Sequence, residues 1–281
     1  MSRNRRPEET VILITGASSG IGQACAERLA RRGYRVFGTS RRAPFPPTPP
    51  PPGQPVMLQM DVTQDESVQR AVDLIVRETG RLDVVVNNAG FGIAGAVEDT
   101  SLAEAKSQLE TNFFGVLRVC RAALPVMRAQ GGGLIINISS LGGVIALPFQ
   151  ALYSASKFAV EGLTEALRLE VRPFGIRVTL IEPGDMRTGF TDRRVRVAGW
   201  TQESAYGPYG ERVLQVVEHD ERSGGSPEAV AALLERIIRS SNPAPRYRVG
   251  PAFQRLAATL KGILPGRLFE WALAKYYHLD G

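Results

Sequence analysis

Residues 11–22 read Val-Ile-Leu-Ile-Thr-Gly-Ala-Ser-Ser-Gly-Ile-Gly, an apolar run that enters a glycine-rich turn and leaves it with helical spacing. Such a strand–turn–helix unit brings backbone amides close to an anionic ligand at the helix N-terminus. Gly16 permits a tight turn, and Gly20 allows a pyrophosphate to approach the backbone. Gly22 allows the helix to pack closely on the strand. The turn therefore predicts a dinucleotide site formed by Gly16, Ser18, Ser19, Gly20, Ile21 and Gly22.

Short apolar runs alternate with amphipathic segments along most of the chain. Several runs are apolar on both faces, as buried parallel strands are. Repeated βα units with right-handed crossovers predict one α/β domain, a doubly wound parallel sheet of about seven strands flanked by helices. Strands are expected at 11–15, 35–39, 56–60, 82–86, 134–138, 178–181 and 246–249, and long helices at about 102–127 and 151–171.

Three segments lie outside this pattern. A basic arm, 1–9, precedes the domain, which we place at 10–250. Seven of the nine residues from 44 to 52 are proline, so a stiff extended loop is expected over 44–55, with a ligand for an SH3-like module as the alternative. An amphipathic helical extension, 251–281, packs on the domain, covers a substrate opening, joins subunits or rests on a membrane surface.

Composition excludes several classes of function. The net charge of +6 comes from scattered arginines, which favours a solvated surface over a nucleic-acid site and assists anionic ligands. Cys25 and Cys120 are interpreted as core residues, and His219 and His278 have no ligand partners, so no metal site is expected. Neither a signal peptide nor a bilayer-spanning run is evident, which predicts a cytoplasmic protein.

Tyr153 and Lys157 stand four positions apart, with Ser140 upstream and Asn112 earlier still. Residues four apart share one helix face, so the ammonium can lie beneath the phenol. A nearby cation lowers the pKa of a phenol towards the range in which proton transfer is efficient. The spacing predicts a tuned general acid/base.

Six ordered motifs between residues 10 and 190 resemble the short-chain dehydrogenase/reductase family. They are Thr-Gly-x-x-x-Gly-Ile-Gly, Asn87-Asn88-Ala89-Gly90, Asn112, Ile138-Ser139-Ser140, Tyr153-x-x-x-Lys157 and Pro183-Gly184. The resemblance implies a Rossmann-type sheet and an NAD(P)-dependent reaction between a ketone or aldehyde and an alcohol. It also implies a homodimer or homotetramer.

The resemblance assigns roles to individual residues. Tyr153 would exchange the proton of the substrate oxygen, Lys157 would lower its pKa and bind the nicotinamide ribose, and Ser140 would hold the oxygen. Asn112 would position a water between Lys157 and solvent, although it could equally be a helix-surface amide. Asp61 and Val62 would lie at the adenine, although Asp61 could instead cap a helix. Asn88, Ala89 and Gly90 would lie beneath the adenosine. The residues near the carboxamide would be Pro183, Gly184, Met186 and Thr188.

Cofactor choice is expected at the end of the second strand, where an acidic residue would bind a free ribose hydroxyl. This chain has Ser40 there, followed by Arg41 and Arg42. A hydroxyl beside guanidinium groups suits a 2′-phosphate, so NADP(H) is favoured over NAD(H).

The substrate side is predicted from a lid region, 189–225, and an apolar pocket. Its residues would be Ser140, Leu141, Phe149, Tyr153 and Tyr206. These favour a hydrophobic steroid-, retinoid- or acyl-like ketone or alcohol, and the sequence is similar in this respect to hydroxysteroid and retinol dehydrogenases. A noncatalytic NADP-binding sensor or scaffold with the same fold is the alternative.

Overall fold

The computed structural model describes residues 6–44, 47–201 and 203–279. Its main sheet has seven parallel strands in the order β3-β2-β1-β4-β6-β7-β9, which confirms the predicted doubly wound sheet. The order reverses between β1 and β4, and such a switch point is where open α/β sheets bind ligands. The strands are β1 (Val11–Ile14), β2 (Arg35–Ser40), β3 (Val56–Gln59), β4 (Val84–Asn87), β6 (Gly133–Ile138), β7 (Ile176–Pro183) and β9 (Arg246–Val249).

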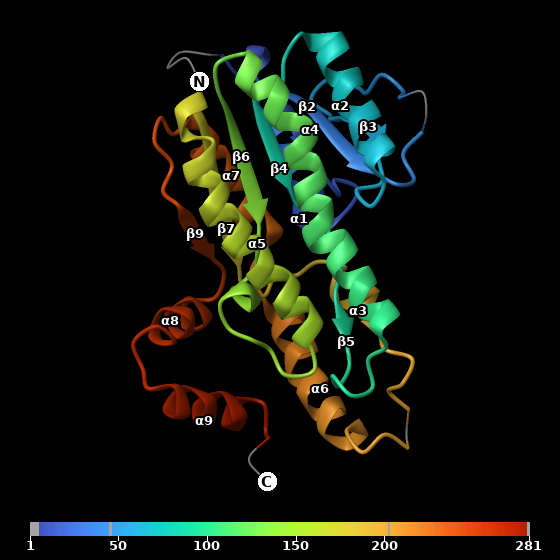
Figure 1. Cartoon of the computed structure of the whole chain (residues 1–281), viewed down its shortest axis with the longest axis vertical. Coiled ribbons are helices and arrows are strands. Elements are labelled where there is room, and N and C mark those ends of the chain that lie inside the picture. The colour runs from blue at the N-terminus through green and yellow to red at the C-terminus, as the bar shows by residue number, and fades with distance from the viewer. Residues whose placement is uncertain (1–5, 45–46, 202, 280–281) are drawn as a thin grey trace.

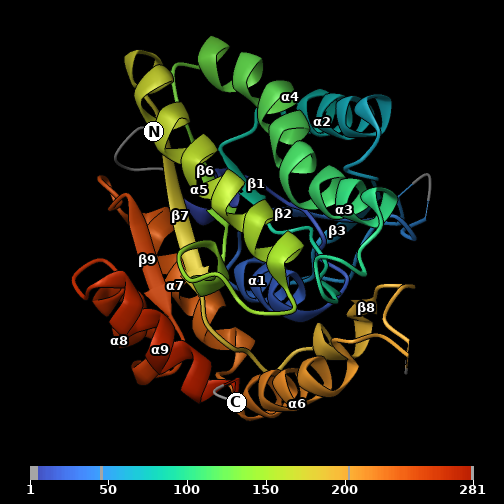
Figure 2. The ribbon, with the colours of Figure 1, turned by 60° about the horizontal axis from the view of Figure 1, so that its bottom comes forward.

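Helices cover both faces of the sheet (Figures 1 and 2). Successive strand residues point to opposite faces, so Val11 and Leu13 join one core and Ile12 and Ile14 the other. The two cysteines are buried in these two different cores, as core residues. One face carries α1 (Gly20–Arg31) and α7 (Pro227–Arg239), and the other α2 (Asp65–Thr79), α4 (Gly115–Ala129) and α5 (Ala151–Glu170).

The long helix predicted at 102–127 is present as an unbroken helical stretch, but its hydrogen-bond pattern changes in the middle. It divides into α3 (Leu102–Leu109), a π-helical turn η2 (Glu110–Phe114) and α4. The physical reason is Asn112, whose side chain is 1% exposed and bonds inward to Phe91 and Ser156. A π-turn inserts one extra residue into a helix, often at a functional site.

The remaining elements extend the domain beyond the carboxyl ends of the strands, at the bottom of Figure 1. They include α6 (Gly207–Ser223), α8 (Ala252–Leu260), α9 (Gly266–Tyr276) and a small sheet of β5 (Ile93–Ala94) with β8 (Val195–Arg196). Short 3-10 turns lie at η1 (Pro7–Glu9), η3 (Leu141–Gly143), η4 (Arg172–Phe174) and η5 (Thr191–Arg193).

Two predicted segments fall partly outside the described residues, namely 1–5 of the arm and 45–46 of the proline-rich loop. The loop contains no helix over 41–44 and 47–55, as its prolines require. Within the described ranges, no helix is long and apolar enough to cross a membrane.

The packing of α1 on the end of β1 leads to a stability prediction. A Cβ on Gly22 would lie 2.4 Å from both Nδ2 of Asn88 and the carbonyl oxygen of Gly16. We expect Gly22→Ala to lower the free energy of unfolding by about 1–3 kcal/mol, because the helix must move to make room. Urea unfolding measures this change.

Gly162 gives the matched control. It is exposed inside α5, and a Cβ there meets nothing within 4 Å. Gly162→Ala should therefore stabilise the protein by about 0.5–1 kcal/mol. Equal effects of the two substitutions would contradict close packing at Gly22.

Candidate active site

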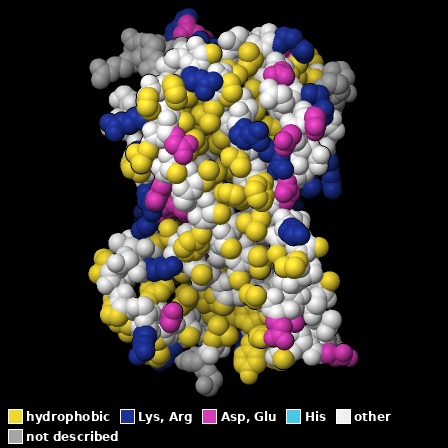
Figure 3. All heavy atoms as spheres, in the orientation of Figure 1, with side chains coloured by type: hydrophobic (Ala, Val, Ile, Leu, Met, Phe, Trp, Pro, Cys, Tyr) yellow, Lys and Arg dark blue, Asp and Glu magenta, His cyan; other side chains and the backbone are white. Residues whose placement is uncertain are grey.

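A cavity of about 950 Å³ runs along the carboxyl ends of the strands. Its walls come from the turn after β1, the ends of β2, β4, β6 and β7, the start of α5, and the lid and C-terminal helices. Figure 3 shows hydrophobic side chains over both the upper and the lower half of this face of the molecule. The predicted site residues that line this cavity are Gly16, Ser18, Ser19, Gly20, Ile21, Ser40, Arg41, Asp61, Val62, Asn88, Ala89, Gly90, Ser140, Leu141, Tyr153, Lys157, Pro183, Gly184, Met186 and Thr188.

Hydrogen bonds between the ends of β1 and β4 hold the glycine turn. Thr15 Oγ1 accepts from the backbone amides of Asn88 at 2.9 Å and Ala89 at 2.8 Å. In return, Nδ2 of Asn88 donates to the carbonyl oxygens of Thr15 and Gly16 at 2.9 and 3.2 Å. Gly16 and Gly20 have φ of +65° and +57°, a conformation that favours glycine.

The turn fits the phosphates of a dinucleotide. The first amides of a helix have no intrahelical acceptor, and the N-cap residue Ser19 makes no side-chain cap bond to them. The hydroxyl of Ser19 instead accepts from Arg193 Nη1 at 2.6 Å, which brings a lid guanidinium to the turn. An anion at this position would meet amide donors, a helix N-terminus and a cation.

The outer end of the cavity contains Ser40, Arg41 and Asp61, which were predicted to face the adenosine part of the cofactor. Ser40 Oγ accepts from the Arg42 amide at 3.2 Å, and within the described residues no carboxylate pairs with Arg41 or Arg42. Asp61 lines the same end, and its Oδ1 accepts from the amide and hydroxyl of Thr63 at 2.9 and 2.8 Å. Asp61 therefore serves the local turn as well as facing the cavity.

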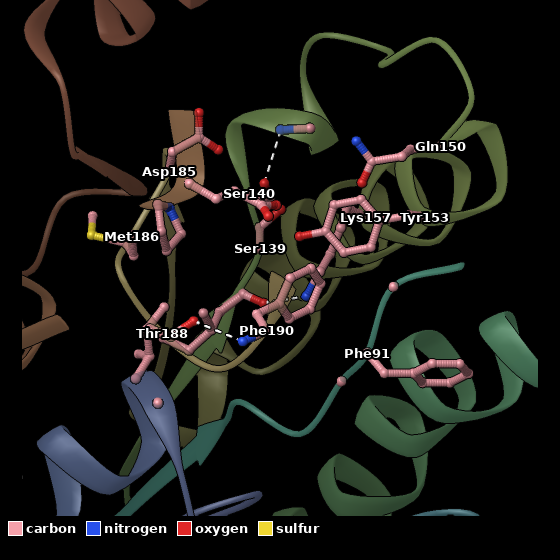
Figure 4. Close-up of a pocket in the computed structure, with 18 of the residues that line it drawn as sticks. Phe91, Ser139, Ser140, Gln150, Tyr153, Lys157, Asp185, Met186, Thr188 and Phe190 are labelled. Atoms are coloured by element: carbon pink, nitrogen blue, oxygen red, sulfur yellow. Dashed lines mark hydrogen bonds between the residues drawn. The ribbon is translucent and has the colours of Figure 1, made fainter. Parts of the chain in front are cut away.

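The proton-transfer candidates meet deeper in the cavity (Figure 4). Ser140 Oγ, two residues after the end of β6, accepts from the Gly142 amide at 3.0 Å and directs its own proton at the Tyr153 phenol. Lys157 Nζ lies 5.9 Å from the centre of the Tyr153 ring and donates to the Ile138 carbonyl at 2.9 Å.

The pKa values correct one expectation. Burial raises the pKa of Tyr153 to about 12, against the lowering effect of a hydrogen bond from Ser140. Burial also lowers the pKa of Lys157 to about 8, while Glu161 acts to raise it. The expected lowering of the tyrosine pKa by Lys157 is therefore absent in the protein alone, because desolvation dominates and the ammonium bonds to Ile138.

Four predicted site residues do not line the cavity. Asn112 is behind it, with Nδ2 donating to the Phe91 carbonyl at 3.0 Å and to Ser156 Oγ at 3.1 Å. Gly22 is packed inside α1.

Phe149 packs on Trp200 with ring centres 5.9 Å apart, and Tyr206, 37% exposed, donates to Glu98 at 2.6 Å. Neither of these two aromatic residues is among those that line the cavity.

Several lining residues escaped the sequence analysis. Phe190 packs on Tyr153 with ring centres 5.7 Å apart, and Gln150 and Asp185 flank the reaction centre. The C-terminal helices add Phe253, Gln254, Ala257, Phe269, Ala272, Leu273, Tyr276 and Tyr277. Their only sequence signal was the amphipathic pattern of 251–277, which does not specify what the apolar side covers.

A glycine turn that opens onto a reversal of strand order defines a nucleotide-binding α/β protein of the Rossmann type. The family model for short chain dehydrogenases matches residues 10–197, and the chain belongs to the short-chain dehydrogenase/reductase family. It is therefore an oxidoreductase of alcohol and carbonyl groups that uses a nicotinamide dinucleotide.

Individual proteins resemble nearly the whole chain. A 3-ketodihydrosphingosine reductase of Bacteroides thetaiotaomicron is 47% identical over 271 residues, which cover 95% of this chain and 97% of that protein. Human 17-beta-hydroxysteroid dehydrogenase type 1 is 35% identical over 85% of this chain and 76% of its own. The crystal structure of a short-chain dehydrogenase from Streptomyces avermitilis has a TM-score of 0.77 and 32% identity, with 95% and 98% of the two chains covered.

The buried ammonium of Lys157 predicts a pH-dependent stability. Its pKa is lowered from 10.5 to about 8, so between these values the unfolded chain binds the proton that the folded protein has lost. The free energy of unfolding therefore rises with pH across this window, and below pH 8 the folded protein bears the full cost of the buried charge. We expect Lys157→Met to be more stable than the wild type at pH 7 by about 1–3 kcal/mol.

Urea unfolding at pH 7 and pH 10 tests this expectation, and the gain should shrink at the higher pH. Lys106→Met, at an exposed position of α3, is the control for loss of a lysine. A stability difference between Lys157→Met and the wild type that is the same at both pH values would disprove the assignment.

Proposed function

We propose that the protein is an NADP(H)-dependent reductase of a ketone on a long hydrophobic chain, with Tyr153 as the proton donor. The observation that carries the proposal is the meeting of Ser140, Tyr153 and Lys157 in the same cavity as the glycine turn. A bound NADPH would supply hydride to the carbonyl carbon. The protein must then hold the carbonyl oxygen and protonate it.

With its pKa raised to about 12, Tyr153 is protonated at neutral pH. At neutral pH the phenol keeps its proton, which is the form that a general acid needs. Ser140 Oγ accepts from Gly142 and directs its proton at Tyr153, so a carbonyl oxygen bound between the two would receive this proton in place of the phenol. Lys157 supplies positive charge beneath the ring as negative charge develops on the phenol oxygen.

The preference for NADP(H) rests on the end of β2. Arg41 lines the cavity beside Ser40, and no carboxylate of the described chain neutralises its guanidinium. A 2′-phosphate would supply the missing negative charge with charge-assisted hydrogen bonds.

The substrate class rests on the deep, apolar end of the cavity and on the relatives. Ile145 and Leu147 line the cavity together with Val217, Ala257 and Leu273, and they form apolar clusters with these residues of α6, α8 and α9. The Bacteroides relative is named for 3-ketodihydrosphingosine, whose ketone lies near one end of a long alkyl chain. We propose this compound as a substrate.

Tyr153→Phe tests the proton donor. Removing the hydroxyl should lower kcat with 3-ketodihydrosphingosine by a factor of about 10² to 10⁴, and NADPH affinity should change little. Absorbance of NADPH reports turnover and its fluorescence reports binding. NADPH binding without turnover in the wild type, over a panel of ketones, would instead support the noncatalytic sensor.

Arg41→Asp tests the cofactor. We expect a loss of NADPH affinity of at least about tenfold and a much smaller loss for NADH, because the new carboxylate repels the 2′-phosphate. Arg121→Asp, at an exposed site of α4, makes the same change in net charge and is the control. Equal losses with both cofactors would refute a 2′-phosphate contact at Arg41.

A further inference from the structure

Two polar side chains flank the reaction centre and have no part in the chemistry proposed above. Asp185 follows β7 and Gln150 precedes α5, and both line the cavity. In Figure 4 they lie on opposite sides of Ser140 and the Tyr153 hydroxyl. Gly184, the neighbour of Asp185, is close to Leu141, since a Cβ on it would lie 3.2 Å from Leu141 Cδ1.

Asp185 is held in place by α8, and the charge of Arg194 acts on it from beyond ion-pair distance. Gln254 Nε2 donates to Asp185 Oδ2, and the Asp185 amide donates to Gln254 Oε1 at 2.9 Å. Over residues 6–44, 47–201 and 203–279, no lysine or arginine nitrogen lies within 4 Å of this carboxylate. Burial raises the pKa of Asp185 to about 6, with Gln254 lowering it and Glu221 and Asp220 raising it. The cavity thus contains a carboxylate that a cation would stabilise.

Gln150 is a second, independent sign of a ligand. Its side chain is 2% exposed, and Nε2 has no hydrogen-bond partner. A buried amide donor without an acceptor is costly, so such groups commonly mark a ligand or water position. Gln150 lines the cavity, and a turn of its side-chain amide would bring Nε2 to an acceptor oxygen of a ligand there.

The walls beyond these two residues are apolar. Ile145, Leu141 and the α8 residue Ala258 are buried together, with Phe269 and Leu273 of α9 packed against them. The end of α9 contacts α6 through Tyr277 and Val217. The cavity therefore combines a polar region at Tyr153 with an apolar region towards the C-terminal helices.

We propose that Asp185 and Gln150 form a head-group subsite that selects a long-chain ketone carrying an ammonium on the neighbouring carbon. Asp185 binds the ammonium, Gln150 donates to the adjacent hydroxyl, and the alkyl chain lies between α6, α8 and α9. This assignment rests on the proposed function and deepens it. In such a compound the nitrogen is two bonds from the carbonyl carbon, and Asp185 lines the same cavity as Ser140 and Tyr153.

The test compares two substrates in variants of the full-length protein. The substrates are 3-ketodihydrosphingosine and the long-chain ketone of equal length that lacks the amine but keeps the hydroxyl. We expect Asp185→Asn to raise KM for the amino ketone by about 10- to 100-fold and to change KM for the desamino ketone less than about twofold. Turnover of the desamino ketone also shows that the variant is folded.

Two further variants sharpen the result. Asp73→Asn, on the exposed face of α2, is the carboxylate control and should leave both KM values unchanged. Gln150→Leu should raise KM for both hydroxyl-bearing ketones and spare an analogue without the hydroxyl.

An equal effect of Asp185→Asn on the amino and desamino ketones, or no effect on either, would overturn the head-group subsite. Absence of turnover of both ketones by the wild type would instead count against the proposed function. Calorimetric binding of dihydrosphingosine then still separates the two ideas, since weakened binding by Asp185→Asn supports the subsite and unchanged binding refutes it.

Discussion

The hydroxyl of Thr15 and the side-chain amide of Asn88 join the ends of β1 and β4, and the cavity floor depends on this contact. Parallel strands end at one edge of a sheet, but their connecting loops need cross-links to stay in register with one another. Four hydrogen bonds of 2.8 to 3.2 Å supply them here. With the two loops fixed, the first amides of α1 remain available to a ligand, and Gly22 can approach the floor without a side chain.

The site lowers the free energy of unfolding because it removes charged groups from water. Lys157 is buried with a backbone carbonyl as its hydrogen-bond partner, and Asp185 with an amide. Glu161, one turn beyond Lys157 on α5, is also buried, and its pKa is raised to about 7 mainly by that burial. The apolar cores on both faces of the sheet offset this loss of stability. A large buried core allows a domain to remain folded with desolvated charged groups at a functional site.

Local spacing explains what the sequence could predict. The strands, the glycine turn and the Tyr153–Lys157 pair each depend on residues within one element or one turn, and all lie where expected. The π-turn at Asn112 could not be foreseen, because it follows from contacts with Phe91 and Ser156 on other elements. Phe149 and Tyr206 were misplaced for the same reason. Their apolar or aromatic character suited a pocket, but only tertiary packing decides which way such rings face.

The segment 189–225 contacts both ends of the cavity. Arg193 contacts Ser19 on the glycine turn, while the next residue, Arg194, pairs with Glu221 of α6. Thr191 donates to the same glutamate at 2.6 Å, so the short η5 turn is tied firmly to α6. Asp220, beside Glu221, accepts a hydrogen bond from Tyr276 at the end of α9. One short segment therefore contacts both the glycine turn and a helix that encloses the apolar end. The carboxyl ends of the strands position the reactive groups near Tyr153. The contacts of the segment 189–225 with α6, and of α6 with α9, shape the space in which the rest of a substrate must fit.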